Sequence, residues 1–203
     1  MNRGLQCFLS IVCCILMLGC SVPEKHKVSV HGEIKNLGVS SLCISYFNEG
    51  NELAHDTVYA SQSGKFDFKI HPYDEISPVT IYFSGKKCWT TLFAQPGDHV
   101  NIKGNINQVD LLNISGGIVN NDLSKYKKQI RKLYLDRFSI LSGKYTTVEE
   151  SEERLAEINL LLKRSAKECI KDHPSAIASV VLIQDFFYQD YDPCTKELLN
   201  LLE

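Results

Sequence analysis

The sequence predicts an α+β protein: an antiparallel β-sandwich or barrel of about eight strands, followed by a helical segment of roughly three to four helices. Two observations support this fold class. Short runs of alternating apolar and polar residues, separated by turn formers, fill residues 28–117. After Asn120 the apolar residues recur at every third or fourth position instead of every second. We therefore expect a β-domain at 28–117 and a helical segment at 121–203.

The N-terminus has the pattern of a secretion signal. A short leader with Arg3 precedes an almost wholly apolar run at 5–18, which is too short to span a bilayer as a helix. The run ends in Leu-Met-Leu-Gly-Cys20, which resembles the lipobox of bacterial lipoproteins, with Met17 where leucine is usual. The resemblance implies a lipoprotein signal peptide at 1–19 and attachment of lipid to Cys20. An ordinary cleaved signal followed by a chance cysteine is the alternative.

The residues after Cys20 form the predicted tether, 20–27. Fully extended, Ser21 to Lys27 reach at most about 25 Å, so the folded part is expected close to the membrane. Surface-exposed lipoproteins of Bacteroidota tend to carry an acidic run here, whereas this chain has only Glu24. We expect a lipid-anchored protein of the cell envelope that faces the periplasm, held by acyl chains such as palmitate.

Charge and cysteine content narrow the classes of function. The net charge of −2 argues against a nucleic-acid partner. Three of the eight cysteines leave with the signal peptide, and Cys20 is the lipid site. The others are possible disulfide partners whose pairing the sequence leaves open: Cys43, Cys88, Cys169 and Cys194. None belongs to a Cys-x-x-Cys pair, and Cys43 lies between apolar strand residues, which favours a buried free thiol there.

The clearest strand pattern surrounds Gly64. A strand at 56–60, a turn, and a strand at 65–70 form a hairpin, in which Phe66, Phe68 and Ile70 alternate with charged residues. Further strands are expected at 28–35, 41–47, 78–83, 90–94, 99–103 and 109–114.

The helical segment begins with an amphipathic helix at 122–141. A second helix is expected at 147–171, because Thr147 and Glu150 have the form of a capping box. Pro174 and Pro193 are positioned to open a third and a fourth helix. The apolar faces of these helices must be buried from solvent, so we expect the helices to pack on the β-domain or on one another.

Several short motifs, in their order along the chain, resemble a known lipoprotein module. They are Val30-His-Gly-Glu-Ile, Asp56-Thr-Val, Ser63-Gly-Lys-Phe-Asp-Phe, Leu92-Phe-Ala-Gln-Pro-Gly-Asp and Ile114-Ser-Gly-Gly. The module is domain of unknown function 4369 of Bacteroidota, which commonly precedes a thioredoxin-like domain of the TlpA or AhpC type. That family's Trp-Cys-x-x-Cys domain would begin about where this chain ends. The resemblance therefore implies fold and location, but no redox-active residue.

The candidate binding residues are few. The six histidines are scattered without ligand spacing, so we expect no metal and no cofactor. Trp89 is either a binding platform or a plug for the core. Basic residues of the first helix form either a solvated face or a contact for anionic lipid or a partner: Lys125, Lys127, Lys128, Arg131, Lys132 and Arg137.

No catalytic motif occurs in the chain, and so we expect a membrane-tethered, non-enzymatic envelope lipoprotein with a β-rich binding or scaffold domain. Its expected partners are the membrane, through the lipid, and an envelope protein or a thioredoxin-like domain. The alternative is the N-terminal portion of a TlpA/AhpC-like thiol-disulfide oxidoreductase that lacks its thioredoxin-fold catalytic domain. A redox role for the four cysteines themselves is the weakest hypothesis, because no spacing among them lowers a thiol pKa.

Overall fold

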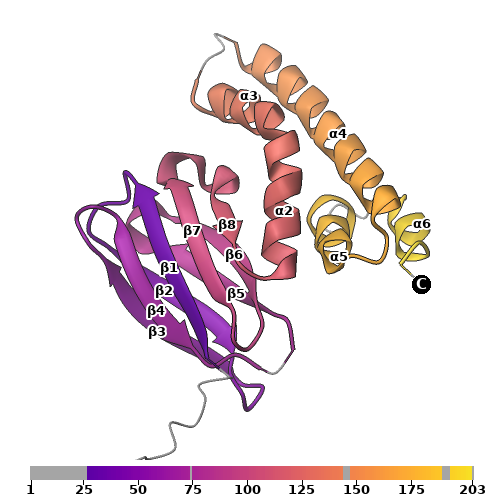
Figure 1. Ribbon diagram of the computed structural model, residues 1–203. Helices are drawn as coiled ribbons and strands as arrows, with labels where there is room; N and C mark the ends of the chain where they lie inside the picture. The colour runs from indigo at the N-terminus through magenta and orange to yellow at the C-terminus, as the bar shows by residue number, and fades with distance from the viewer. Residues whose placement is uncertain (1–26, 74, 144–146, 189–192, 203) are drawn as a thin grey trace, which may run out of the picture.

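The computed structural model describes residues 27–73, 75–143, 147–188 and 193–202. It confirms the α+β class, with a β-sandwich followed by helices that stand along one side of it (Figure 1). The predicted signal peptide and Cys20 lie outside the described residues, and so does the predicted tether apart from Lys27.

The described chain forms eight strands in two four-stranded sheets. The strands are β1 Val28–Lys35, β2 Ser40–Phe47, β3 Leu53–Ala60, β4 Lys65–Ile70, β5 Ser77–Phe83, β6 Cys88–Ala94, β7 His99–Asn105 and β8 Asn113–Ser115. One sheet has the order β4-β1-β7-β8 and the other β3-β2-β5-β6. The predicted alternation holds, since Phe66, Phe68 and Ile70 of β4 are buried between the sheets while the lysines of that strand are exposed.

Three details of the predicted sandwich are corrected. The strands at 56–60 and 65–70 do not form the predicted hairpin, because β3 pairs with β2 and β4 pairs with β1, so that the turn at Gly64 carries the chain from one sheet to the other. The sheets do not close into a barrel, and the first sheet is mixed because β1 pairs in parallel with β7, with Val30 opposite Val100. The sequence pattern could not predict strand direction, because apolar and polar residues alternate in the same way in parallel and antiparallel strands. The predicted strand at 109–114 is wrong in its first half, where the 3₁₀ turn η2, Ile106–Leu111, occupies these residues and leaves only β8 as strand.

The helices are α2 Ile118–Gln129, α3 Arg131–Leu141, α4 Val148–Asp172, α5 Ile177–Ile183 and α6 Thr195–Leu199, with a π-helical turn, η3 Gln184–Tyr188, after α5. Thr147 caps α4 as predicted, because its Oγ1 accepts a hydrogen bond from the Glu150 N–H at 3.3 Å. The single helix predicted at 122–141 is wrong. The chain bends at the buried Ile130, so that α2 and α3 both reach α4 (Figure 1).

Side chains at the start of α2 join the helices to the sandwich. Asn120 is buried and hydrogen-bonds the backbone of Phe93 on β6 twice, at 2.8 Å and 2.6 Å. Ser124 Oγ hydrogen-bonds the N–H and the C=O of Ile114 on β8. These contacts satisfy backbone groups at the edges of both sheets, and they fix the direction in which α2 leaves the sandwich.

Candidate functional site

A cleft of about 580 Å³ lies between strand β6 and the helices. One wall consists of the outer faces of β5 and β6, and the other of α2 and α5 with the π-helical turn. π-Helical turns are uncommon and often occur at functional sites. A volume of this size lies in the range of ligand pockets, so the cleft is our candidate binding site.

Apolar side chains are exposed on both walls of the cleft. Trp89 projects from β6 with 64% of its surface exposed, and Ile177 and Val180 of α5 are each 47% exposed. Phe186 of the π-helical turn lies beside them and partly buries Tyr126 of α2 through an edge-to-face contact with ring centroids 6.5 Å apart. Trp89 is therefore not a core plug, and this alternative from the sequence is wrong.

A group of charged residues lies at the helical side of the cleft. Lys127 and Tyr134 come from α2 and α3, Asp110 from η2 and Asp185 from the π-helical turn. Burial lowers the pKa of Lys127, although Asp110 and Asp185 oppose this effect, and burial raises the pKa of Asp185 against the effect of Lys127. Burial, with smaller contributions from both aspartates, raises the pKa of Tyr134 to about 12. The group holds charges of opposite sign, with Lys127 half-buried and both aspartates exposed to solvent.

Both sequence-based alternatives, a solvated face or a contact for anionic lipid or a partner, placed Lys127 on an exposed basic face, and for this residue the placement is wrong. Lys125, Lys128, Arg131 and Lys132 are exposed, but Lys127 is half-buried in the cleft. The spacing contained the necessary clue, because Leu123, Lys127, Ile130 and Tyr134 fall on one helical face at steps of three and four.

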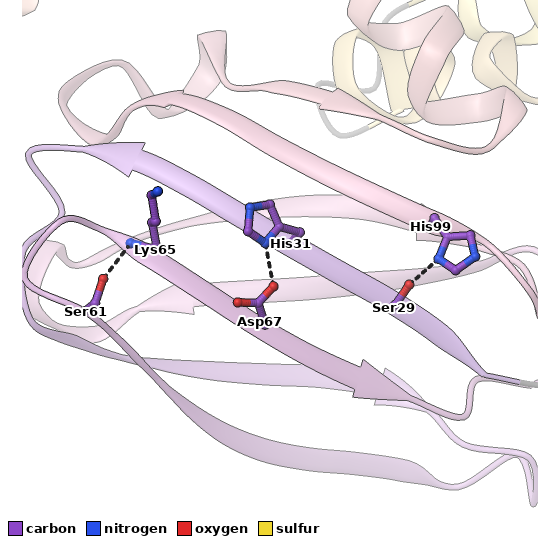
Figure 2. Close-up of polar contacts among 6 residues, drawn as sticks. All are labelled: Ser29, His31, Ser61, Lys65, Asp67 and His99. Atoms are coloured by element: carbon purple, nitrogen blue, oxygen red, sulfur yellow. Dashed lines mark hydrogen bonds and ion pairs between the residues drawn. The ribbon is translucent and has the colours of Figure 1, made fainter.

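The outer face of the first sheet carries a second polar cluster, which Figure 2 shows. Ser29 Oγ lies 2.5 Å from His99 Nδ1, and His31 Nδ1 lies 2.5 Å from Asp67 Oδ1. These are residue types of a hydrolytic triad, yet the serine and the aspartate contact different imidazoles. All four side chains lie on the open, wet face of β4, β1 and β7, so this cluster is a weaker candidate than the cleft.

The four cysteines that could have paired are all thiols in the structure. Cys43 faces outward from β2, whereas Cys88 packs against the core between the sheets, so these two lie on opposite faces of one sheet. Cys169 and Cys194 belong to the helical core, and Cys194 Sγ accepts a hydrogen bond from Lys167 Nζ at 3.5 Å. Burial raises the pKa values of Cys88 and Cys169, which disfavours their reactive thiolates.

The described residues bring together no group of three or more His, Cys, Asp or Glu side chains that could hold a metal ion. Among them, too, no helix is both long and apolar enough to cross a membrane. No family model matches the sequence, and a search of curated proteins found no match either. The resemblance to the Bacteroidota lipoprotein module therefore stays a prediction.

Proposed function

We propose that this protein is a lipid-anchored, non-enzymatic binding protein of the cell envelope, and that it holds its partner in the cleft between β6 and α5. The observation that carries the proposal is the exposure of apolar side chains on facing walls, Trp89 on one and Ile177 and Val180 on the other. Burial of such surface in a partner is favourable by about 25 cal/mol per Å². Exposed apolar surface gathered in one concave place is typical of a binding site.

The anchor in this proposal is Cys20, and its support is the lipobox pattern of the sequence. Lys27 leads directly into β1, so a tether of a few residues holds the sandwich near the membrane surface. A partner of this protein is therefore expected in the periplasm or at the membrane.

A test of the anchor is metabolic labelling with an alkyne analogue of palmitate. The wild-type protein should incorporate the label and sediment with membranes, and Cys20→Ala should do neither. Label on the Cys20→Ala variant, or an unlabelled wild-type protein, would remove the lipid anchor from the proposal.

A test of the cleft is a thermal-shift screen of peptide, glycan and lipid fractions prepared from bacterial envelopes. At least one fraction should raise the melting temperature of the wild-type protein but not that of Trp89→Ala or Val180→Asp. The matched control is Tyr59→Ala, because Tyr59 is 72% exposed on β3 of the same sheet but lies outside the cleft. If the shift survives both cleft variants, the cleft is not the binding site.

The second candidate function is the N-terminal portion of a thiol-disulfide oxidoreductase, and it rests on the sequence resemblance. The hydrogen-bonded junction at Asn120 favours it, since helices held against the sandwich could position a further domain. Sequencing of the locus downstream of the codon for Glu203 tests this candidate. A thioredoxin-like reading frame there would favour it, and an unrelated gene would argue against it.

A further inference from the structure

The outer edge of β6 carries backbone groups that point away from its sheet. β6 is the last strand in the order β3-β2-β5-β6. The N–H of Phe93 donates to Asn120 Oδ1 and its C=O accepts from Asn120 Nδ2, so both groups point away from β5. In an antiparallel pair this direction alternates from residue to residue. The N–H and C=O groups of Thr91 and Trp89 therefore also point outward.

These outward groups have no hydrogen-bond partner among the described residues. They also lie in the cleft itself. The side chains of Trp89 and Thr91 face away from the sandwich core and that of Thr90 faces toward it, yet all three residues line the cleft. Asn120 reaches this edge from α2, and α2 also lines the cleft through Leu123 and Lys127, so the cleft lies beside the edge of β6. The cleft thus exposes the hydrogen-bonding edge of β6.

We propose that the partner held in the cleft is an extended polypeptide segment that adds to β6 as a further strand. The inference rests on the proposed function and names the class of partner. Outward N–H and C=O groups on every second residue match another extended backbone, which is the chemistry of strand addition. Unpaired edges of this kind readily accept a segment from another chain.

The residues around the edge of β6 determine which polypeptide segment can bind there. The side chain of Asn120 already hydrogen-bonds the N–H and the C=O of Phe93. The added strand is therefore short and pairs with Thr91 and Trp89 only. Side chains on its outer side would face Trp89, Ile177 and Val180, and we expect these to be apolar at alternate positions. The opposite wall of the cleft comes from α5 and the π-helical turn of the same chain.

The test uses the lipidated protein in detergent micelles and a displayed library of unstructured nonapeptides as the probe. Selected peptides should carry alternating apolar residues, and the amides of Trp89 and Thr91 should exchange at least tenfold more slowly when a peptide is bound. Thr91→Pro removes one outward N–H from an edge position where proline is tolerated, and it should weaken binding about tenfold. Thr91→Val keeps the N–H and should bind within about twofold of wild type.

Several results would overturn strand addition. They are a library with no enriched peptide, bound peptides that leave both amides unprotected, and equal binding by Thr91→Pro and Thr91→Val. A dimer that protects the same amides would show a second copy at the edge and would also overturn the proposal. If Thr91→Pro fails to fold, amide exchange in the wild-type protein still decides. The cleft proposal fails separately, when Trp89→Ala and Val180→Asp leave every bound fraction unaffected.

Discussion

The side chain of Asn120 pairs with the backbone of Phe93 as a neighbouring strand would, donating to the carbonyl at 2.6 Å and accepting from the amide at 2.8 Å. The same Asn120 amide also donates to the C=O of Gly116 at 2.7 Å. One buried side chain thus ends the open edge of β6 and holds the helices against the sandwich.

Replacing this side chain should weaken the junction strongly. Asn120→Ala leaves the backbone groups of Phe93 and Gly116 without partners, and we expect a loss of about 2–4 kcal/mol in the free energy of unfolding. Urea denaturation measures the loss. Asn121→Ala is the matched control, because this exposed neighbour makes one hydrogen bond to the Gly116 N–H and should cost less than about 1 kcal/mol. Equal losses in the two variants would contradict the role of Asn120.

The turn at Gly64, which connects β3 of one sheet with β4 of the other, should tolerate no side chain. Gly64 has a φ of +76°, and an added Cβ would lie 2.0 Å from the carbonyl oxygen of Ile34. Gly64→Ala should therefore destabilise the protein by about 2–4 kcal/mol. At Gly38 φ is +65° but an added Cβ meets nothing within 4 Å, so Gly38→Ala should cost only about 1 kcal/mol. Thermal unfolding of both variants measures these costs. Both variants carry the backbone strain of a positive φ, so the difference between them gives the cost of the steric clash at Gly64.

Alkaline pH should unfold the protein through its buried tyrosines. Burial, and then the hydrogen bond to Asp56, raises the pKa of Tyr46 to about 12, and burial raises that of Tyr134 to about 12. A raised pKa in the folded state means that the stabilisation is complete below pH 10 and is lost as the pH rises toward 12. Urea midpoints should fall across this range, and less steeply in Tyr46→Phe. A urea midpoint that stays constant as the pH rises from 10 toward 12 would show that folding does not raise the pKa of these tyrosines.

The cysteines should titrate as thiols. Unfolded without reductant, a version of the protein that begins at Ser21 should react with four equivalents of a thiol reagent, at Cys43, Cys88, Cys169 and Cys194. In the native protein Cys88 and Cys169 should react slowly, because burial raises their pKa values. Mass spectrometry after timed alkylation identifies each site. Two equivalents instead of four would reveal a disulfide and would contradict the arrangement described above.

Much of the fold was predictable because strand burial follows a local pattern. The strand around Phe66 and Phe68 was predicted with its observed bounds, although the strand it was expected to pair with lies in the other sheet. Thr147 was identified as a helix cap from the residue three positions later. The parallel partner of β1 and the bend at Ile130 were not predictable in this way. Both depend on which distant residues the chain brings together, such as Val100 beside Val30.

The candidate site was only half visible in the sequence. Trp89 was identified from the sequence as a binding platform or a plug for the core. Which of the two it is depended on the position of β6 at the edge of its sheet. Asp110 and Asp185 carry no local signal. Asp110 lies near Lys127 only after the helices fold against the sandwich, and Asp185 only after α2 packs beside the π-helical turn. The open edge itself is a property of strand order, which amino-acid alternation does not encode.

Site-specific photo-crosslinking in living cells tests the central claim, that the cleft is where this protein binds. The photoreactive residue would replace Val181 in the cleft wall or, as the control, Tyr59 on β3. We predict an adduct from position 181 that disappears when Val180→Asp is added, and no comparable adduct from position 59. An adduct that is equal at both positions, or unaffected by Val180→Asp, would contradict the account.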